Sequence, residues 1–218
     1  MKYLIAGGTG LIGRKLLLSL VEDGNEVTVL SRSPRKSTDH ILRYARWDGK
    51  SVPKLDRDFD AVINLSGAGI MDKAWTKSRK KELEDSRLKT TNALVDFINK
   101  AEKKPKVFVN ASAVGFYGNK GKKEITEETS RGDNYVAELC ERWEQAALKA
   151  NTRVVLLRTG LVLAKEGGLL PESLLSFHFG VAAYFGDGKH GYPWIHIADE
   201  VGAIRFCVEN EKIEGAVN

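Results

Sequence analysis

A cluster of glycines near the N-terminus has the clearest chemical meaning in this chain. It reads Gly7-Gly8-Thr9-Gly10-Leu11-Ile12-Gly13 and lies between a short apolar run and a segment with apolar side chains at helical spacing. Where a strand, a glycine-rich turn and a helix follow one another, backbone N–H groups and the positive end of the helix bind phosphate. The alternative is a tight turn without a ligand.

Each glycine of this loop has its own expected role. Gly7 allows the tight turn, Gly10 lets the backbone approach a pyrophosphate, and Gly13 lets the helix pack closely on the strand. The loop residues that we expect to contact the pyrophosphate are Gly7, Thr9, Gly10, Leu11, Ile12 and Gly13.

A basic turn follows the second predicted strand, about twenty residues beyond the glycines, where such a loop–helix unit meets the adenosine ribose of a dinucleotide. An NAD site needs a carboxylate there, but this chain has Ser31, Arg32 and Arg35. Guanidinium and hydroxyl groups suit a 2′-phosphate, which a carboxylate would repel. The turn therefore predicts NADP(H) rather than NAD(H), against the alternative of an ordinary basic turn.

Residues after three further predicted strands complete the cofactor candidates. Asp48 either accepts a hydrogen bond from the adenine amino group or caps its own turn, and the sequence leaves both interpretations open. The small residues that follow the fourth strand would let a cofactor lie across the strand ends. These candidates are Asn64, Leu65, Ser66 and Gly67, with Gly160 after the sixth strand.

Three hydroxyl side chains are the candidates for proton chemistry. Ser112 lies just past a predicted central strand, where it could orient a substrate oxygen. Tyr117 or Tyr135 would then donate the proton. The competing interpretations are an aromatic packing role for Tyr117 and a solvent-reaching helix tyrosine for Tyr135. Arg158, at a strand end, would pair with a phosphate or with a structural carboxylate. His196, in a short apolar run, is typical of a hydrogen-bonded core histidine, and Trp194 of a core or pocket-wall residue.

Alternating strands and helices must position these groups. The first strand is expected in the apolar run before the glycines. Further strands are expected at 26–30, 41–47, 60–65, 107–110, 152–157 and 194–197, and helices at 11–21, 76–101, 133–150 and 199–208. Periodicity weakens over 163–193. This order predicts an α/β fold with a doubly wound parallel sheet.

Composition excludes several classes of function. The net charge is +5, but much of the excess lies in 76–87, where acids alternate with bases as on a solvated helix face, so nucleic-acid binding is not expected. No run reaches the roughly 18 apolar residues of a membrane span. The N-terminus does not read as a signal peptide. Two cysteines without ligand spacing and four scattered histidines predict buried free thiols, a cytoplasmic location and no metal site.

The glycine loop resembles that of extended short-chain dehydrogenases/reductases. Further motifs resemble an atypical branch, the epimerase family proteins of the bacterial nucleoside-diphosphate-sugar epimerase type. They are Asn64-Leu65-Ser66-Gly67, Ser86-Arg87, Gly115-Phe116-Tyr117-Gly118, Thr126-Glu127-Glu128, Cys140 with Trp143-Glu144, Gly167-Gly168 and Trp194-Ile195-His196-Ile197. The resemblance spans essentially the whole chain. It implies an NADP-binding Rossmann domain over 1–162, with the cofactor held by the glycine loop, Ser31, Arg32 and Asp48, and a partial substrate-binding lobe over 163–218 interleaved with the sheet.

The chain departs from the superfamily pattern in two main ways, the residue after Tyr135 at lysine spacing and the length. The superfamily carries a Tyr with a Lys four residues later, but Leu139 follows Tyr135 at that spacing. A phenol without a neighbouring cation has a pKa near ~10 and is a poor base at neutral pH. Ala113, rather than Ser112, could occupy the position of the superfamily serine. The branch also usually continues past residue 218, so the substrate lobe is expected to be incomplete.

Two functions are consistent with these residues. The first is an NADP(H)-dependent oxidoreductase or epimerase that transfers hydride to or from a small carbonyl or nucleotide-sugar-like substrate. The second is a non-catalytic protein that senses NADP(H). The superfamily also implies a homodimer through the helices predicted at 76–101 and 133–150.

Overall fold

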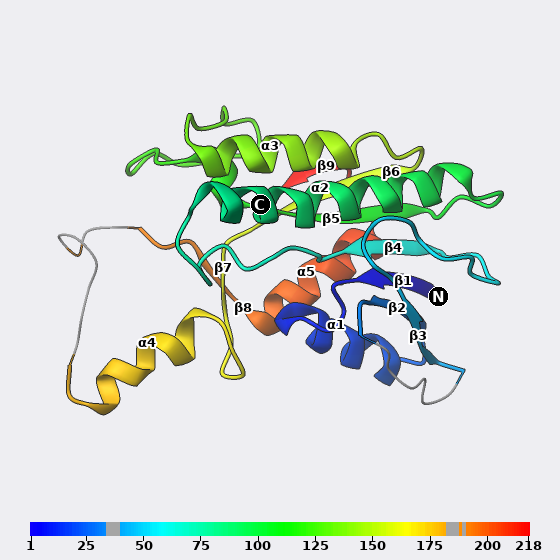
Figure 1. Ribbon diagram of the computed structural model, residues 1–218, viewed down its shortest axis with the longest axis horizontal. Coiled ribbons are helices and arrows are strands. Elements are labelled where there is room, and N and C mark those ends of the chain that lie inside the picture. Colours follow the sequence, from blue (N-terminus) through cyan, green and yellow to red (C-terminus); the bar gives the residue numbers. More distant parts are fainter. Residues whose placement is uncertain (34–39, 182–187, 189–190) are drawn as a thin grey trace.

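A seven-stranded sheet forms the centre of the molecule (Figure 1), in a computed structural model that describes residues 1–33, 40–181, 188 and 191–218. The strand order is β3-β2-β1-β4-β5-β6-β9, and every pairing is parallel. The strands are β1 (Lys2–Ala6), β2 (Glu26–Ser31), β3 (Leu42–Arg46), β4 (Ala61–Asn64), β5 (Val107–Ala113), β6 (Arg153–Thr159) and β9 (Gly215–Val217). The predicted doubly wound α/β fold is confirmed.

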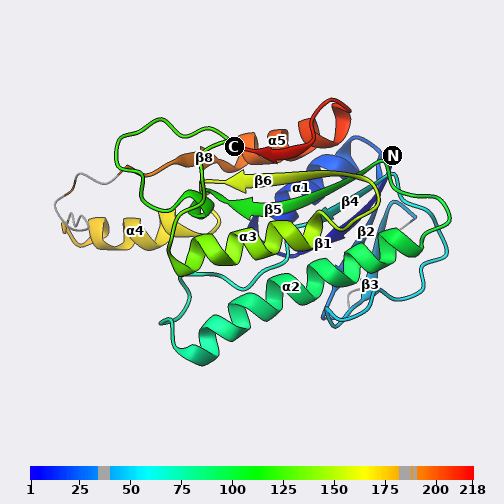
Figure 2. The same ribbon diagram turned by 90° about the horizontal axis from the view of Figure 1, so that it is seen from above.

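Helices cover both faces of this sheet (Figure 2). α1 (Leu11–Glu22) and α5 (Ile197–Glu209) pack on one face, while α2 (Lys77–Lys100) and α3 (Tyr135–Ala147) pack on the other. Successive side chains of a strand point to opposite faces, so the apolar run in β4 must be buried twice. Accordingly Ile63 packs in the α1/α5 core and Val62 in the α2/α3 core.

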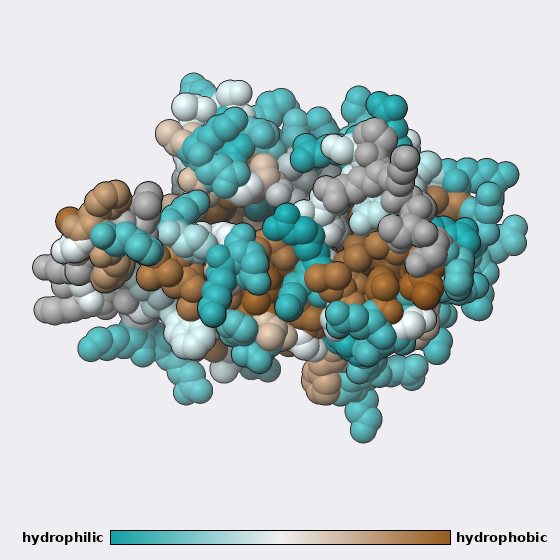
Figure 3. Space-filling view, turned by 90° about the horizontal axis from the view of Figure 1, so that it is seen from below, coloured by the Kyte–Doolittle hydropathy of each residue, from teal (hydrophilic) through white to brown (hydrophobic). Residues whose placement is uncertain are grey.

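A smaller unit projects from one end of the sheet. β7 (Leu161–Leu163) pairs in parallel with β8 (Trp194–His196), and α4 (Leu169–His178) lies away from the main body in Figures 1 and 2. The space-filling view from the side of α1 and α4 shows apolar side chains set among hydrophilic ones (Figure 3). No helix of the described residues is long and apolar enough to cross a bilayer.

Beyond residue 190, the expectation for His196 is wrong, and one of the two alternatives for Trp194 is excluded. His196 is exposed and serves as the N-cap of α5, where its Nδ1 accepts a hydrogen bond from the Ala198 N–H at 3.3 Å. The Trp194 side chain is 64% exposed, which excludes the core position and leaves its other expected role, in a pocket wall, as a prediction. The physical reason is that β7 and β8 form a two-stranded sheet, which leaves one of its faces uncovered.

Candidate functional site

The glycine loop has the shape that its spacing predicts. Gly7 has a φ of +81°, and a methyl group on it would lie 2.6 Å from the Leu65 carbonyl oxygen. A methyl group on Gly13 would overlap the Gly7 carbonyl oxygen and lie 2.6 Å from the Gly8 Cα. By contrast, Gly10 has only the Gly7 carbonyl oxygen near its Cβ position, at 3.3 Å. The loop therefore admits no side chain at Gly7 or Gly13 and leaves the backbone at Gly10 open to approach.

The N-terminus of α1 is suited to an anion. Gly10 is its N-cap and has no side chain to satisfy the N–H groups of the first turn, and the first turn contains no acidic residue. The N–H groups at the start of a helix have no intrahelical acceptor and lie at its positive end. The Leu11 side chain, in the first turn of α1, lies next to Gly167 and Gly168. Methyl groups on these two glycines would lie 3.4 and 3.3 Å from it.

A pocket of about 490 Å³ lies at the ends of β2 and β3. Its lining residues are Arg32, Arg46, Trp47, Asp48, Ser51 and Pro53. Two of the predicted cofactor contacts, Arg32 and Asp48, thus line the same pocket. The Ser31 hydroxyl is buried and donates to the Ser33 carbonyl oxygen at 3.0 Å. Arg35 lies outside the described residues.

Asp48 shows the turn-capping geometry that was one of its two interpretations. Its Oδ1 accepts a hydrogen bond from the Lys50 N–H at 2.9 Å, and Gly49 between them has a φ of +86°. This backbone hydrogen bond holds the pKa of the Asp48 carboxyl below its usual range. Asp48 is therefore a fixed negative charge on the wall of the pocket.

The loop after β4 is held in place by buried amides. The Asn64 Nδ2 donates to the Thr91 Oγ1 at 2.9 Å and to the Asn110 Oδ1 at 2.7 Å, while its Oδ1 accepts from the Ser66 N–H at 3.1 Å. Leu65 donates its N–H to the Ala6 carbonyl oxygen at 2.9 Å, next to the glycine loop. The Asn64 side chain consequently shapes the site rather than lining it.

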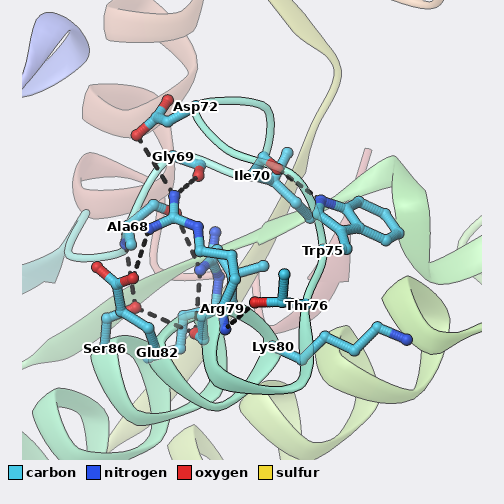
Figure 4. Close-up of polar contacts among 12 residues, drawn as sticks. Ala68, Gly69, Ile70, Asp72, Trp75, Thr76, Arg79, Lys80, Glu82 and Ser86 are labelled. Atoms are coloured by element: carbon cyan, nitrogen blue, oxygen red, sulfur yellow. Dashed lines mark hydrogen bonds and ion pairs between the residues drawn. The ribbon is translucent and has the colours of Figure 1, made fainter.

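Two arginines and a serine of α2 reach this same loop, and sequence reasoning assigned none of them a role in the site. Figure 4 shows Ser86 and Arg79 beside residues 68–70. The Ser86 Oγ accepts from the Ala68 N–H at 3.0 Å, the Arg87 Nη1 donates to the Ala68 carbonyl oxygen at 3.1 Å, and Arg79 donates to the Gly69 carbonyl oxygen. The spacing of Arg79 and Arg87, two helical turns apart, was the available signal.

The two arginines differ in whether a carboxylate lies beside the guanidinium. Arg79 pairs with Glu82 at 2.7 Å, whereas Arg87 has no carboxylate partner among the described residues. Burial lowers the pKa of the Arg87 guanidinium, which lies 5.1 Å from the ring centre of Trp143. A methyl group on Gly67 would lie 3.2 Å from the Arg87 Cζ. An uncompensated cation is thus next to the small residues after β4.

Ser112 belongs to a buried polar network behind the strand ends. Its Oγ donates to the Glu144 Oε1 at 2.6 Å. Glu144 also accepts from the Arg158 Nε at 2.9 Å and Nη2 at 2.8 Å, and both partners are buried. Burial alone would lower the pKa of Arg158, but the hydrogen bonds with Glu144 outweigh it and raise that pKa. Of its two predicted partners, Arg158 therefore has the structural carboxylate.

The tyrosine candidates lie in different places. Tyr117, in the 3₁₀ helix η1 (Val114–Tyr117), is 1% exposed; its hydroxyl accepts from the Arg158 Nη1 at 2.8 Å and donates to the Asn218 Oδ1 at 2.7 Å. Tyr135 begins α3 and donates to the Lys80 carbonyl oxygen at 2.9 Å. Burial raises the pKa of Tyr135, so its hydroxyl is not activated as a base.

A buried carboxyl that the sequence did not indicate lies beside Thr159, the last residue of β6. The Glu200 side chain, on α5, is 2% exposed, and its Oε1 accepts from the Thr159 Oγ1 at 2.8 Å. Burial raises the pKa of this carboxyl, although the Thr159 hydrogen bond opposes the shift. Next to Thr159, Gly160 is constrained by packing, because a methyl group there would lie 2.6 Å from the Pro193 carbonyl oxygen.

Glu200→Gln is expected to change how stability depends on pH. Above the unfolded-state value of 4.5, the folded protein keeps a proton that the unfolded chain releases, so stability falls as pH rises through the raised pKa of Glu200. Glutamine does not ionise, so the variant lacks this loss. Its free energy of unfolding in urea, relative to that of the unsubstituted protein, should therefore be more favourable at pH 8 than at pH 5. The exposed Glu211→Gln is the control. A difference that is constant with pH would contradict the argument.

Comparison with known proteins gives the family. A family model described as the NAD dependent epimerase/dehydratase family matches residues 3–218. An epimerase family protein of Staphylococcus saprophyticus is 36% identical over 221 residues, which cover 99% of this chain and 74% of that protein. A chloroplastic homologue of the epimerase family protein SDR39U1 in Arabidopsis thaliana is 36% identical, with 100% of this chain and 65% of that protein covered.

Solved structures agree with this assignment. The human epimerase family protein SDR39U1, crystallised with NADPH, superimposes with a TM-score of 0.88 at 34% identity, over 100% of this chain and 73% of that chain. A nucleoside-diphosphate sugar epimerase from Corynebacterium glutamicum gives 0.84 at 33% identity, over 100% and 46%. The glycine loop before α1 and these relatives lead to one assignment: the chain belongs to the NAD-dependent epimerase/dehydratase family.

Proposed function

We propose that this protein is an NADP(H)-dependent oxidoreductase or epimerase that acts on a small carbonyl or nucleotide-sugar-like substrate. The observation that carries the proposal is the pairing of two sites at the same edge of the sheet. One is the uncapped N-terminus of α1 with its glycine loop, and the other is the pocket lined by Arg32. The NADPH bound in the human relative supports the choice of cofactor.

The described residues fit this cofactor at its pyrophosphate and at its adenosine end. The N–H groups at the start of α1 would bind the pyrophosphate, and the loop of residues 65–67 would lie beside it, with Arg87 supplying an uncompensated positive charge. Arg32 would bind the 2′-phosphate, and Asp48 lines the same pocket. The bound nicotinamide supplies a hydride, two electrons and one proton, to a substrate carbon.

Reduction of a carbonyl also requires one proton on the oxygen, which this chain must deliver. We propose Ser112, Tyr117 and Tyr135 for orienting and protonating that oxygen. Tyr117 is the best connected of them, because Arg158 donates to its hydroxyl and the same hydroxyl donates to Asn218. Residues 163–218 would contribute the substrate-binding lobe, with the exposed aromatic rings of Tyr192 and Trp194 on its surface.

One observation favours the alternative function of an NADP(H) sensor without catalysis. Leu139, at the position of the superfamily lysine, is 1% exposed and packed in α3, so α3 itself supplies no cation at that position. The cation that lies over the Tyr135 ring is Lys80 of α2, with its Nζ 4.7 Å from the ring centre. In addition, the Tyr135 hydroxyl donates to the Lys80 carbonyl oxygen. Tyr135 is therefore not arranged as a strong base, and the sensor would use the same cofactor site.

A binding and turnover experiment separates the two functions. NADPH binding is measured by calorimetry, and NADPH absorbance is then followed against aldehydes, ketones and nucleotide sugars. Turnover that is lost in Ser112→Ala, Tyr117→Phe or Tyr135→Phe supports the enzyme, whereas binding without turnover supports the sensor. Tyr3→Phe is the control, because Tyr3 lies near the start of β1, at the opposite end of that strand from the glycine loop. No binding of either NADPH or NADP⁺ by folded protein would overturn both functions.

A further inference from the structure

Two arginines meet at the adenosine end of the proposed cofactor site, although sequence reasoning identified only one of them. Arg46 ends β3, and the parallel register places it beside Ser31 of β2, the residue before Arg32. Both arginines are exposed and line the same pocket. The basic turn after β2 therefore accounts for only part of the positive charge of this pocket.

Within the described residues, no carboxylate forms an ion pair with the guanidinium of Arg32 or Arg46. Asp48 lines the same pocket, but its carboxylate instead accepts the Lys50 N–H. Unpaired guanidiniums on adjacent strand ends are the arrangement that binds a phosphate monoester through charge-assisted hydrogen bonds.

A buried donor at the same pocket also lacks a partner. Trp47 follows Arg46, is 5% exposed, and its indole N–H has no hydrogen-bond acceptor in the part of the chain that the structure describes. A buried N–H without an acceptor costs free energy, and such groups often receive their acceptor from a ligand. Trp47 is also a lining residue of the pocket, so this unpaired donor belongs to the pocket wall beside Arg46.

We propose that Arg46 is a specificity-determining residue, which binds the 2′-phosphate of NADP(H) together with Arg32. The inference rests on the proposed function, because it assumes that the dinucleotide lies with its adenosine end in this pocket. The 2′-phosphate is absent from NAD(H), so the Arg46 interaction discriminates between the two cofactors instead of strengthening both. Removing Arg46 should consequently weaken NADPH binding and leave NADH binding unchanged.

Calorimetry with Arg46→Met tests this directly. Removing a hydrogen bond to a charged group should lower the affinity of Arg46→Met for NADPH by roughly 10- to 100-fold. Adenosine 2′,5′-bisphosphate should lose affinity by the same factor, while NADH and ADP should not. The matched control is Arg43→Met, because Arg43 is an exposed arginine of the same strand that does not line the pocket. In Arg32→Met with Arg46→Met, the preference for NADPH over NADH should disappear.

The outcomes distinguish the inference from the function beneath it. Unchanged NADPH affinity in Arg46→Met, with Arg32→Met impaired, would overturn the role of Arg46 and leave the cofactor site intact. Equal losses for NADPH and NADH would overturn specificity, since Arg46 would then contact a part of the nucleotide that both cofactors share. A wild-type protein that binds neither dinucleotide refutes the proposed function itself.

Discussion

Alanine at Gly13 is expected to abolish measurable NADPH binding and to destabilise the fold. The added methyl group would overlap the Gly7 carbonyl oxygen and lie 2.6 Å from the Gly8 Cα, so backbone rather than a flexible side chain would have to move. Overpacking of this kind costs roughly 1 to 3 kcal/mol. The displaced groups are those that would bind the pyrophosphate, so we expect a loss of more than about 100-fold in NADPH affinity, by the free energy scale of binding.

A second glycine in a helix provides the control for this substitution. Gly202 lies within α5, and a methyl group on it would have no atom within 4 Å. Gly202→Ala should therefore stabilise the protein by about 0.5 to 1 kcal/mol in urea unfolding, through helix propensity alone. Calorimetry should show unchanged NADPH binding. If Gly13→Ala behaved like Gly202→Ala, the loop could not have the tight packing described.

Removal of the Glu144 carboxylate is expected to have the largest effect on stability. Glu144→Ala leaves the Arg158 guanidinium buried without its counter-ion and removes the acceptor of the Ser112 hydroxyl. Breaking a buried pair by deleting one partner costs about 3 to 5 kcal/mol. Chemical denaturation at pH 7 measures the change.

An exposed ion pair between α2 and α3 is the natural comparison. Glu84 accepts two hydrogen bonds from Arg142, at 2.6 and 3.1 Å, at the surface. Surface pairs contribute less than about 1 kcal/mol, so Glu84→Ala should lower stability far less than Glu144→Ala. Similar losses in the two variants would show that the Glu144 network contributes no more than a solvated pair.

The features that depend on local sequence could be predicted well. The roles of Gly7 and Gly13 follow from spacing alone, and a positive φ at Gly7 and close packing at Gly13 are found. The apolar run of β4 predicts a strand buried on both faces, because its length and continuity suit a parallel sheet. The helix predicted at 76–101 differs from α2 by one residue at each end, since Thr76 is its N-cap.

The features that depend on distant residues could not be predicted. Arg46 reaches the site through the register between β2 and β3, which no local pattern determines. The network of Ser112, Glu144 and Arg158 joins two strands and a helix, so the sequence marks Ser112 and Arg158 as candidates but does not show that Glu144 connects them. His196 was misjudged because its apolar neighbours indicate burial, whereas a two-stranded sheet buries little.

The two cysteines offer a way to observe each layer of the molecule opening on its own. Cys140 of α3 and Cys207 of α5 are buried free thiols on helices that cover opposite faces of the sheet. Burial raises the pKa of Cys140 to about 11, so the folded protein should react slowly with alkylating reagents at neutral pH. In a variant that keeps only one cysteine, the alkylation rate would therefore report how often the helix that carries it detaches from the sheet. Comparing the two variants with and without NADPH would show whether the nucleotide slows the opening of α3 more than that of α5.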